Sequence, residues 1–278
     1  MNMKMKRVIE KSINLNDCLK QLMFSKKDIH LLKMEKRLKV NDDIVISDIV
    51  LHKNDVLEID VIKDEEIDKT PIVQDIKILY EDDFVLVVDK PIGIIIHDDG
   101  NKDTLTLDNL ISGYYQSTSQ KHRILHVHRL DKETSGCILY CKQSYLIAYF
   151  DYCIANNLIN RNYLALVAGI IDKEMIINKK IGKDRHINNK YRISNSGKDA
   201  TTIIKPIKQQ KDTTLIECSL KTGRTHQIRV HLQAIGHPII GDTIYCGKKH
   251  DRLMLHSYKL SFVHPITNEQ ITVESDLN

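Results

Sequence analysis

The sequence has little of what marks fibrous, disordered or membrane-spanning chains. Its 278 residues include only 11 Gly and 5 Pro, which excludes collagen-like and low-complexity classes. Apolar runs are short, and the one at residues 84–88 is far below the roughly 18 residues that a membrane-spanning helix needs. The basic start, MNMKMKRVIEKS, is not followed by an apolar stretch with a small-residue cleavage site. We therefore expect a cytoplasmic protein with no membrane partner.

Paired cysteines are also missing. None of the six cysteines belongs to a C-x-x-C pair, which in a chain of this length speaks against a disulfide framework and against a cysteine-based zinc site. We expect them to be small, buried or half-buried apolar residues. They are Cys18, Cys137, Cys141, Cys153, Cys218 and Cys246.

Histidines are the other candidate metal ligands. His122, His126 and His128 lie close together, and a strand through them would put His126 and His128 on one face, as in a metal pair. No carboxylate or cysteine of this segment completes a ligand set, so we expect no metal. A metal-dependent hydrolase remains an alternative that elemental analysis for zinc would test.

Charge is unevenly distributed along the chain. Residues 1–39 carry eleven Lys and Arg against four Asp and Glu, residues 40–83 carry four against fourteen, and residues 179–211 carry ten against two. Two basic segments separated by an acidic one favour a polyanionic partner met at two places, and nucleic acid is the usual one. Solvated lysine-rich faces are the alternative.

The first part of the chain predicts a small separate module. Leu15, Leu19 and Leu22 recur at helical spacing, and Ser25 precedes a second helical pattern. Short apolar runs between residues 40 and 59 predict strands. We assign residues 1–62 to this module, the charged, Pro71-containing residues 63–75 to a linker, and residues 76–278 to a second domain.

The second domain reads as mostly strands with a few helices. We expect helices at residues 105–115, 145–156 and 227–234, the second of them capped by Ser144. We expect strands at residues 78–80, 84–88, 124–130, 137–141, 163–167, 201–204, 214–220 and 253–262, and a long hairpin or loop in the basic stretch 179–211. Because helices and strands do not alternate strictly, this predicts an α+β fold with a central mixed, mainly antiparallel sheet and flanking helices.

Two segments hold the residues best suited to chemistry. The sequence HRLDKETSG at residues 128–136 lies between two predicted strands, and its Thr-Ser-Gly turn can organise a loop around Asp131. By itself, the segment also fits a plain ion pair between Arg129 and Asp131. The sequence TGRTHQIRVH at residues 222–231 places Arg224 and Arg229 at a junction between a strand and a helix.

These segments belong to a larger pattern that resembles the RluA-type family of RNA pseudouridine synthases. HRLDKETSG is similar to the family's signature around its catalytic aspartate, VVDKPIGIIIH (residues 87–97) to its first motif, and RNYLALVAG (161–169) to its stacking-tyrosine motif. TGRTHQIRVHLQAIGHPIIGDTIY (222–245) is similar to a further motif. The matches are collinear over about residues 78–262. Within them, Arg161 stands where the family commonly has Lys.

The resemblance implies a role for several side chains. Asp131 would be the ionised carboxylate that acts at the ribose, as a nucleophile or as a base. Arg229 would pair with Asp131 and keep it ionised and oriented. Tyr163 would stack on the flipped uracil, and Arg129 would enter the RNA stack where the uridine leaves. Lys90, His97, Arg224 and His226 lie within the motifs, and we predict that Lys90, Arg224 and His226 support the site or bind RNA.

The N-terminal module resembles the small alpha-L, or S-four-type, RNA-binding module that precedes many of these synthases. Its usual Gly-Asp turn is Asn54-Asp55 here. We predict that Lys26, Lys27 and Arg37, together with Lys33, Lys36 and Lys39, face phosphates. A solvated helix face is the alternative.

Together, the residues and the resemblance predict an enzyme that isomerises uridine to pseudouridine in structured RNA without a cofactor. We expect large-subunit ribosomal RNA as the partner, because the appended module is usual for ribosomal members of the family, and a monomer, because the reaction needs no second subunit. Alternatives are a transfer-RNA pseudouridine synthase and a non-catalytic RNA-binding or ribosome-assembly protein.

Overall fold

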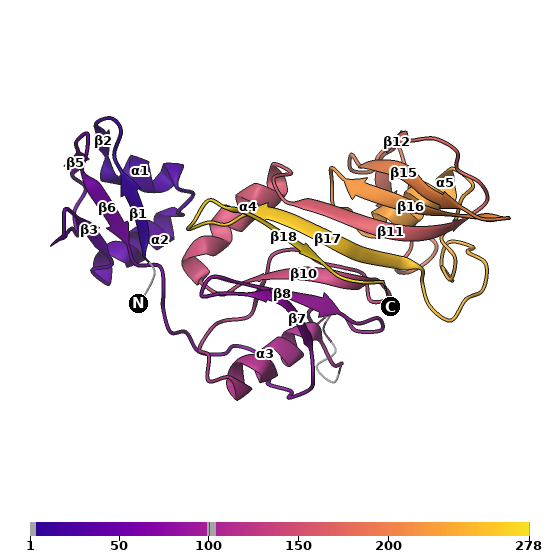
Figure 1. The fold of residues 1–278 in the computed structure, drawn as a ribbon, viewed down its shortest axis with the longest axis horizontal. Helices are drawn as coiled ribbons and strands as arrows, with labels where there is room; N and C mark the ends of the chain where they lie inside the picture. Colours follow the sequence, from indigo (N-terminus) through magenta and orange to yellow (C-terminus); the bar gives the residue numbers. More distant parts are fainter. Residues whose placement is uncertain (1–3, 99, 101–103, 278) are drawn as a thin grey trace.

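A computed structural model describes residues 4–98, 100 and 104–277. Figure 1 shows two bodies, a small one at the N-terminus and a larger one built on a long, twisted sheet. The small body holds a four-stranded sheet and the large one a ten-stranded sheet. This mixture of sheet and few helices agrees with the predicted α+β class.

The N-terminal sheet has the strand order β1-β6-β3-β4, and a second ribbon pairs β2 with β5. The predicted helix start at Ser25 is confirmed, because its hydroxyl accepts a hydrogen bond from the Asp28 N–H at 3.1 Å. The elements are β1 (Met5–Val8), β2 (Ile13–Asn14), α1 (Leu15–Gln21), α2 (Lys26–Met34), β3 (Leu38–Val40), β4 (Asp43–Ile44), β5 (Val50–Leu51) and β6 (Val56–Ile59).

Residues 63–75 contain no helix or strand, although the domain limits themselves stay a prediction. One acidic side chain ties the start of this segment to both bodies: Glu35 binds Lys63 Nζ at 2.5 Å and accepts from the Tyr145 hydroxyl at 3.1 Å. The Lys63 hydrogen bond is the main reason that the pKa of Glu35 falls to about 2. At neutral pH this carboxylate therefore holds the module by charge.

The large sheet has the order β12-β15-β16-β11-β17-β10-β8-β7, with β18 beside β17 and β9 beside β10. Its strands are β7 (Lys77–Glu81), β8 (Val85–Lys90), β9 (Leu125–His126), β10 (Ser135–Cys141), β11 (Asn160–Ala168), β12 (Met175–Asn178), β15 (Thr201–Gln209), β16 (Thr213–Leu220), β17 (Leu255–Val263) and β18 (Gln270–Glu274). All neighbours are antiparallel except β10 and β17, which run parallel. The predicted mixed, mainly antiparallel sheet is thus confirmed.

Strands β8 and β10 are apolar at every core position because helices cover both of their faces. Alternate residues pack toward α3 (Leu107–Ser117) on one face and toward α4 (Ile147–Ala155) on the other (Figure 1). The first set comprises Leu86, Val88, Ile138 and Tyr140, and the second Val85, Val87, Cys137, Leu139 and Cys141. The other half of the sheet packs against α5 (Gln227–Ala234), whose Ile228 and Leu232 join the core of β11 and β16.

The two halves meet where β10 runs beside β17. Gly136 has φ +110° there, and a Cβ on it would lie 2.2 Å from the Ser257 carbonyl oxygen. Only glycine allows this approach. The pairing of β10 with β17 begins at Ser135, four residues after Asp131, and fixes the end of the loop that carries it.

Several local predictions were wrong. The strand expected at residues 124–130 is only the two-residue β9, since pairing with β10 ends at His126. Ser144 does not cap a helix: it opens the 3-10 turn η1 (Ser144–Leu146), and its hydroxyl instead donates to Glu65. Cys246 is exposed, whereas the other cysteines are buried as predicted.

The basic stretch at residues 179–211 contains a hairpin, as predicted, made of β13 (Ile181–Lys183) and β14 (Tyr191–Ile193). Farther along, the same stretch contains the whole of the sheet strand β15. None of the helices in the described part of the chain has the length and apolar content needed to span a membrane.

Candidate active site

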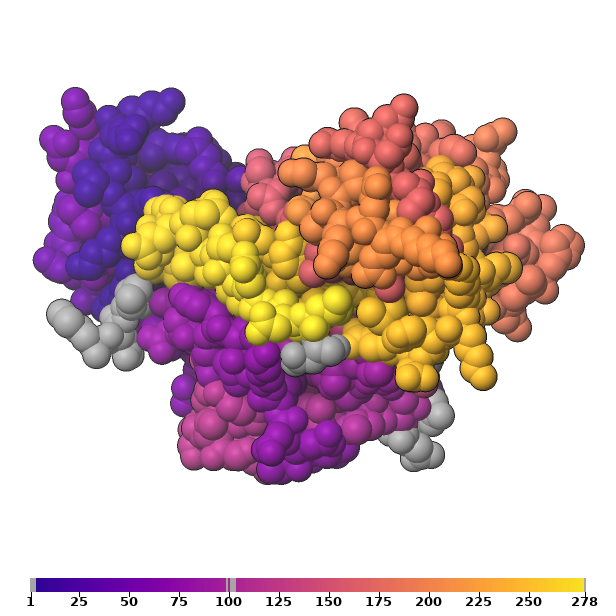
Figure 2. Space-filling model, turned by 45° about the vertical axis from the view of Figure 1, so that its right-hand side comes forward, coloured from indigo at the N-terminus to yellow at the C-terminus, as the bar shows by residue number. Residues whose placement is uncertain are grey.

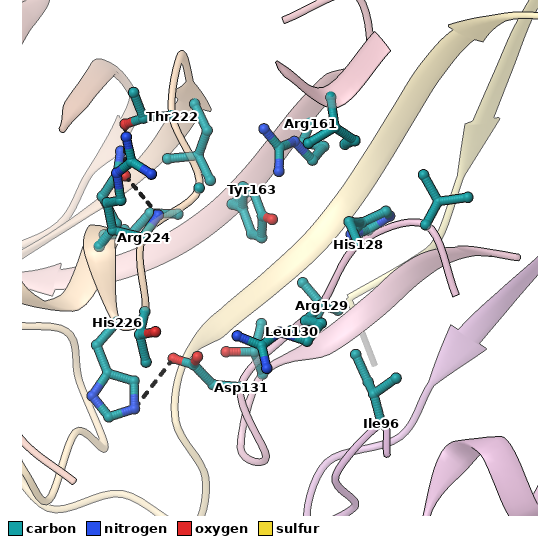
Figure 3. A pocket seen from close by; sticks show the side chains of 18 of the residues that line it. Ile96, His128, Arg129, Leu130, Asp131, Arg161, Tyr163, Thr222, Arg224 and His226 are labelled. Atoms are coloured by element: carbon teal, nitrogen blue, oxygen red, sulfur yellow. Dashed lines mark hydrogen bonds and ion pairs between the residues drawn. The ribbon is translucent and has the colours of Figure 1, made fainter. Parts of the chain in front are cut away.

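A cavity of about 720 Å³ lies between the two halves of the large sheet. Its walls come from the segment before β10, from β11, and from the segment that leads into α5 (Figure 3). The predicted residues Arg129, Asp131, Tyr163, Arg224 and His226 all line it, as does Arg229. Residues from motifs almost a hundred positions apart thus surround one space.

Asp131 lies in the loop between β9 and β10, with its carboxylate facing the cavity and its side chain 22% exposed. The Thr134 N–H donates to the Asp131 carbonyl oxygen at 3.1 Å and closes the turn. Arg229 Nη1 lies 3.3 Å from Asp131 Oδ2. The carboxylate is therefore oriented by a cation while its surface stays open to a substrate.

Arg229 is itself held by a second carboxylate. Its Nε and Nη2 donate to the two oxygens of Asp242, each at 2.8 Å, and both side chains are almost fully buried. Asp242 also accepts from the backbone N–H groups of Ile244 and Tyr245 at 3.1 Å. The guanidinium consequently bridges a buried carboxylate and the one in the cavity, with its planar geometry fixed.

His226 is the second neighbour of Asp131. It has φ 56° at the N-cap of α5, a left-handed conformation that an L side chain adopts only where its surroundings enforce it. Its Nε2 lies 3.8 Å from Asp131 Oδ2, and its Nδ1 lies 2.9 Å from the Tyr245 hydroxyl. Burial lowers the pKa of His226 despite the nearby Asp131 carboxylate, so the imidazole is neutral at pH 7.

Tyr163 lies on β11 with only 4% of its surface exposed, packed into the core beneath α5 while its ring lines the cavity. The segment opposite is shaped by Gln227, whose Oε1 accepts from the Thr222 hydroxyl at 2.7 Å and from the Arg224 N–H at 3.0 Å. Gln227 Nε2 donates to the Thr201 carbonyl. These bonds hold the cavity wall against β15.

Two of the predicted cationic residues, Arg224 and Arg129, differ in whether their side chains are already hydrogen-bonded. Arg224 Nε donates to the Asp199 carbonyl at 2.9 Å and so ties the basic stretch to the cavity wall. Arg129 is exposed at the cavity mouth and forms no ion pair or side-chain hydrogen bond with any residue that the structure describes. Arg129 is therefore available to a ligand.

The prediction that Lys90 contacts RNA is corrected. Its side chain is 0% exposed, and Nζ donates to the carbonyl oxygens of Pro91, Ile94 and Lys132. Burial lowers the pKa of Lys90 to about 8. Lys90 instead joins the first motif to the loop that follows Asp131, which is a supporting role.

The predicted phosphate contacts of the N-terminal module lie outside the cavity. Lys26 and Lys27 are exposed at the start of α2. Arg37 is occupied by Glu35, by Asp60 and by the Ile62 carbonyl oxygen. Lys26 and Lys27 are thus open to a partner, whereas Arg37 braces the module.

The histidines near the cavity do not form a metal site among the described residues, where no group of three His, Cys, Asp or Glu side chains is arranged to hold an ion. His97 stacks on His126, with ring centroids 5.1 Å apart. The sequence reasoning missed the carboxylate nearest to them, Asp108, which lies 3.4 Å from His126 Nδ1. Nothing here favours the metal-dependent hydrolase.

Asp242 and Tyr245 were also missed, although both lie in the last motif. A signal was present, since an arginine buried on a helix needs a carboxylate partner and Asp242 follows Gly241 in a turn. Tyr245 completes the group, with its ring 5.2 Å from the Arg229 guanidinium carbon.

Comparisons with known proteins match both parts of the chain. Residues 84–234 match the family model described as RNA pseudouridylate synthase, and residues 8–57 match the RluD ribosomal pseudouridine synthase N-terminal domain. The chain is 38% identical over 245 residues to the uncharacterized RNA pseudouridine synthase YhcT of Bacillus subtilis, an alignment that covers 86% of this chain and 81% of that protein.

A second relative is the ribosomal large subunit pseudouridine synthase D of Nitrosomonas europaea, which is 35% identical over 215 residues, covering 73% of this chain and 62% of that protein. Among solved structures, human RNA pseudouridylate synthase domain containing 1 superposes with a TM-score of 0.62 at 24% identity, over 75% of this chain and 86% of that one. That likeness shows a shared fold. The chain therefore belongs to the RNA pseudouridylate synthase family, as an RluA-type isomerase that acts on RNA.

Proposed function

We propose that this enzyme converts uridine to pseudouridine in large-subunit ribosomal RNA, with Asp131 as its catalytic carboxylate. One observation carries the assignment: Asp131 faces the cavity and is held at 3.3 Å by Arg229, which Asp242 holds in turn. An acid placed for structure alone would need no such cavity in front of it.

The reaction requires few groups. The bond from uracil N1 to the ribose breaks, the uracil turns within the cavity, and its C5 bonds to the ribose. C5 then loses its proton and N1 gains one, so that substrate and product are isomers. An ionised carboxylate is needed at the ribose, as a nucleophile or as a base. The Arg229 cation favours that ionised form. No step transfers electrons or needs a metal, so we propose that no cofactor takes part.

Tyr163 and Arg129 are suited to hold the nucleotide. Stacking of a base on an aromatic ring contributes about 1–3 kcal/mol, and the Tyr163 ring is rigidly packed in the wall of the cavity. Arg129 is free at the mouth, where its guanidinium can take the place that the flipped uridine leaves. The two side chains come from different halves of the sheet.

Ribosomal RNA is proposed as the substrate from the N-terminal module. That region matches a domain named for a ribosomal pseudouridine synthase, and Lys26 and Lys27 are exposed on it. We propose that the enzyme acts as a monomer, because the reaction as written uses only groups that line this one cavity. We place this activity in the cytoplasm, where unmodified ribosomal RNA is met.

Release of tritium from uridine labelled at carbon 5 tests the proposal directly. Wild-type protein is expected to release tritium from unmodified large-subunit ribosomal RNA, and Asp131→Asn to reduce the rate by about a thousandfold or more. Asp212→Asn is a matched control, because it makes the same change at an exposed carboxylate paired with Lys248.

Other outcomes separate the alternatives. Release from transfer RNA but not from ribosomal RNA would reassign the substrate. Tight binding of ribosomal RNA by folded wild-type protein, with no release from either RNA, would support a non-catalytic role in RNA binding or ribosome assembly.

A further inference from the structure

A second buried arginine enters the same cavity without a partner. Arg161 is the second residue of β11 and only 6% exposed. It precedes Tyr163 by two residues, so both side chains leave the strand on the same face. Figure 3 shows the Arg161 guanidinium beside the Tyr163 ring, on the cavity wall away from Asp131.

Nothing in the described residues neutralises this cation. Arg161 forms no ion pair and no side-chain hydrogen bond there, and its buried Nε has no acceptor. His128 lies near, but burial and then the Arg161 charge lower the pKa of that histidine to about 3, so it supplies no counter-charge. A buried, unpaired guanidinium is unfavourable unless a ligand compensates it.

Space for such a ligand exists beside Gly223. A Cβ at that position would lie 3.0 Å from Arg161 Nη1, so glycine keeps the guanidinium uncovered on that side. Gly223 is itself exposed and lines the cavity. The approach to Arg161 is therefore open from the cavity.

We propose that Arg161 binds a backbone phosphate of the RNA strand that carries the target uridine. RNA offers one kind of anion, the phosphodiester, and a guanidinium can hold two of its oxygens at once. The nearest carboxylate in the cavity, Asp131, is already bound by Arg229. This inference rests on the proposed function only in placing the target nucleotide in the Asp131 cavity.

Salt dependence of RNA binding tests the proposal without relying on turnover. Dissociation constants for unmodified large-subunit ribosomal RNA are measured across a potassium chloride series for wild type, Arg161→Lys, Arg161→Gln and Arg123→Gln. Arg123 is the matched control, since it is an exposed arginine paired with Asp68 away from the cavity. Loss of one phosphate contact lowers the slope of log affinity against log salt by about 0.7 to 0.9.

We expect Arg161→Gln to weaken binding about tenfold at low salt and to show this smaller slope, whereas Arg161→Lys and Arg123→Gln keep the wild-type slope. We also expect Arg161→Met to unfold at the same temperature as wild type or higher, since it removes an unpaired buried charge. An unchanged slope in folded Arg161→Gln, or a clear loss of stability in Arg161→Met, would overturn the proposal in favour of a structural role. Asp131→Asn serves as a check on the proposed function: it abolishes turnover and leaves the slope unchanged, so the two proposals fail separately.

Discussion

The two buried arginines of the cavity are treated in opposite ways. Arg229 binds two carboxylates through three nitrogen atoms. Arg161 is also almost fully buried, but it pairs with no carboxylate of any residue that the structure describes. The charge of Arg229 is neutralised before any substrate binds, whereas the charge of Arg161 is not.

This difference separates two tasks of an enzyme site. A group that must be oriented for reaction is best held in advance, because preorganised charges need no rearrangement during the reaction. A group that recognises a polyanion is best left unpaired, because binding can then supply its counter-charge. The following variants compare the paired arrangement with groups near the cavity and with charges far from it.

The largest effect is expected from breaking the paired arrangement with Asp242→Asn. Removing one member of a buried ion pair costs about 3–5 kcal/mol, and the side chain of Asp242 is 0% exposed. We expect a correspondingly lower urea midpoint and, since Arg229 is freed to turn, a kcat about 10 to 100 times lower. A normal midpoint would show that the Arg229–Asp242 pair does not hold the structure together.

A smaller effect is expected at the unpaired residues of the cavity mouth. Arg129→Gln removes an exposed cation with no partner in the described structure, so stability should not change. If Arg129 fills the space left by the uridine, kcat/KM falls about tenfold, since unstacking is no longer offset. An equal loss in Arg123→Gln would point to general electrostatics and not to the mouth.

Acid sharpens the comparison, because burial and the Arg161 charge keep the neighbouring His128 neutral in the folded protein. The pKa of His128 is about 3 in the folded protein, mainly through burial, against about 6.5 in an unfolded chain. Between these two values the unfolded state therefore binds more protons than the folded state. The contribution of neutral His128 to the free energy of unfolding is fully present above about pH 6.5 and is lost as the pH drops toward 3.

The matched variant is His128→Gln, which keeps an acceptor for the Leu139 N–H. Urea midpoints between pH 7 and pH 4 should fall less steeply in this variant than in wild type. Some slope should persist, since burial also lowers the pKa of His122 to about 4. If the urea midpoints of the variant and of wild type fall equally with pH, the pKa of His128 is not lowered by its burial.

The smallest effect is expected far from both arginines. Lys26→Gln with Lys27→Gln removes two exposed charges from α2, and we expect kcat to be unchanged and the affinity for ribosomal RNA to fall by less than about tenfold at low salt. A large loss of kcat would mean that the N-terminal module orients the substrate in the cavity.

Local signals in the sequence sufficed for some elements. A helix was predicted near residues 227–234, where α5 lies, and the helix start at Ser25 was also predicted. The strand at 124–130 was overcalled, because apolar character does not reveal where pairing with β10 stops. Asp242 was missed as a partner of Arg229, because their contact depends on how the chain returns after α5. The neighbours of His226, Tyr245 and Asp131, were not predicted either, because only the folded chain brings these three residues together.

The position of β17 has a consequence for how the chain is made. Strand β17 (Leu255–Val263) lies between β11 and β10 and joins the two halves of the sheet, and Figure 2 shows this C-terminal segment, in yellow, between them. During synthesis, every cavity residue up to Arg229 leaves the ribosome before the strand that brings the halves together. A nascent chain that has not yet exposed residue 263 therefore carries Asp131 but lacks the strand that completes the sheet around the cavity, so we expect modification of RNA to begin only after translation has passed that point.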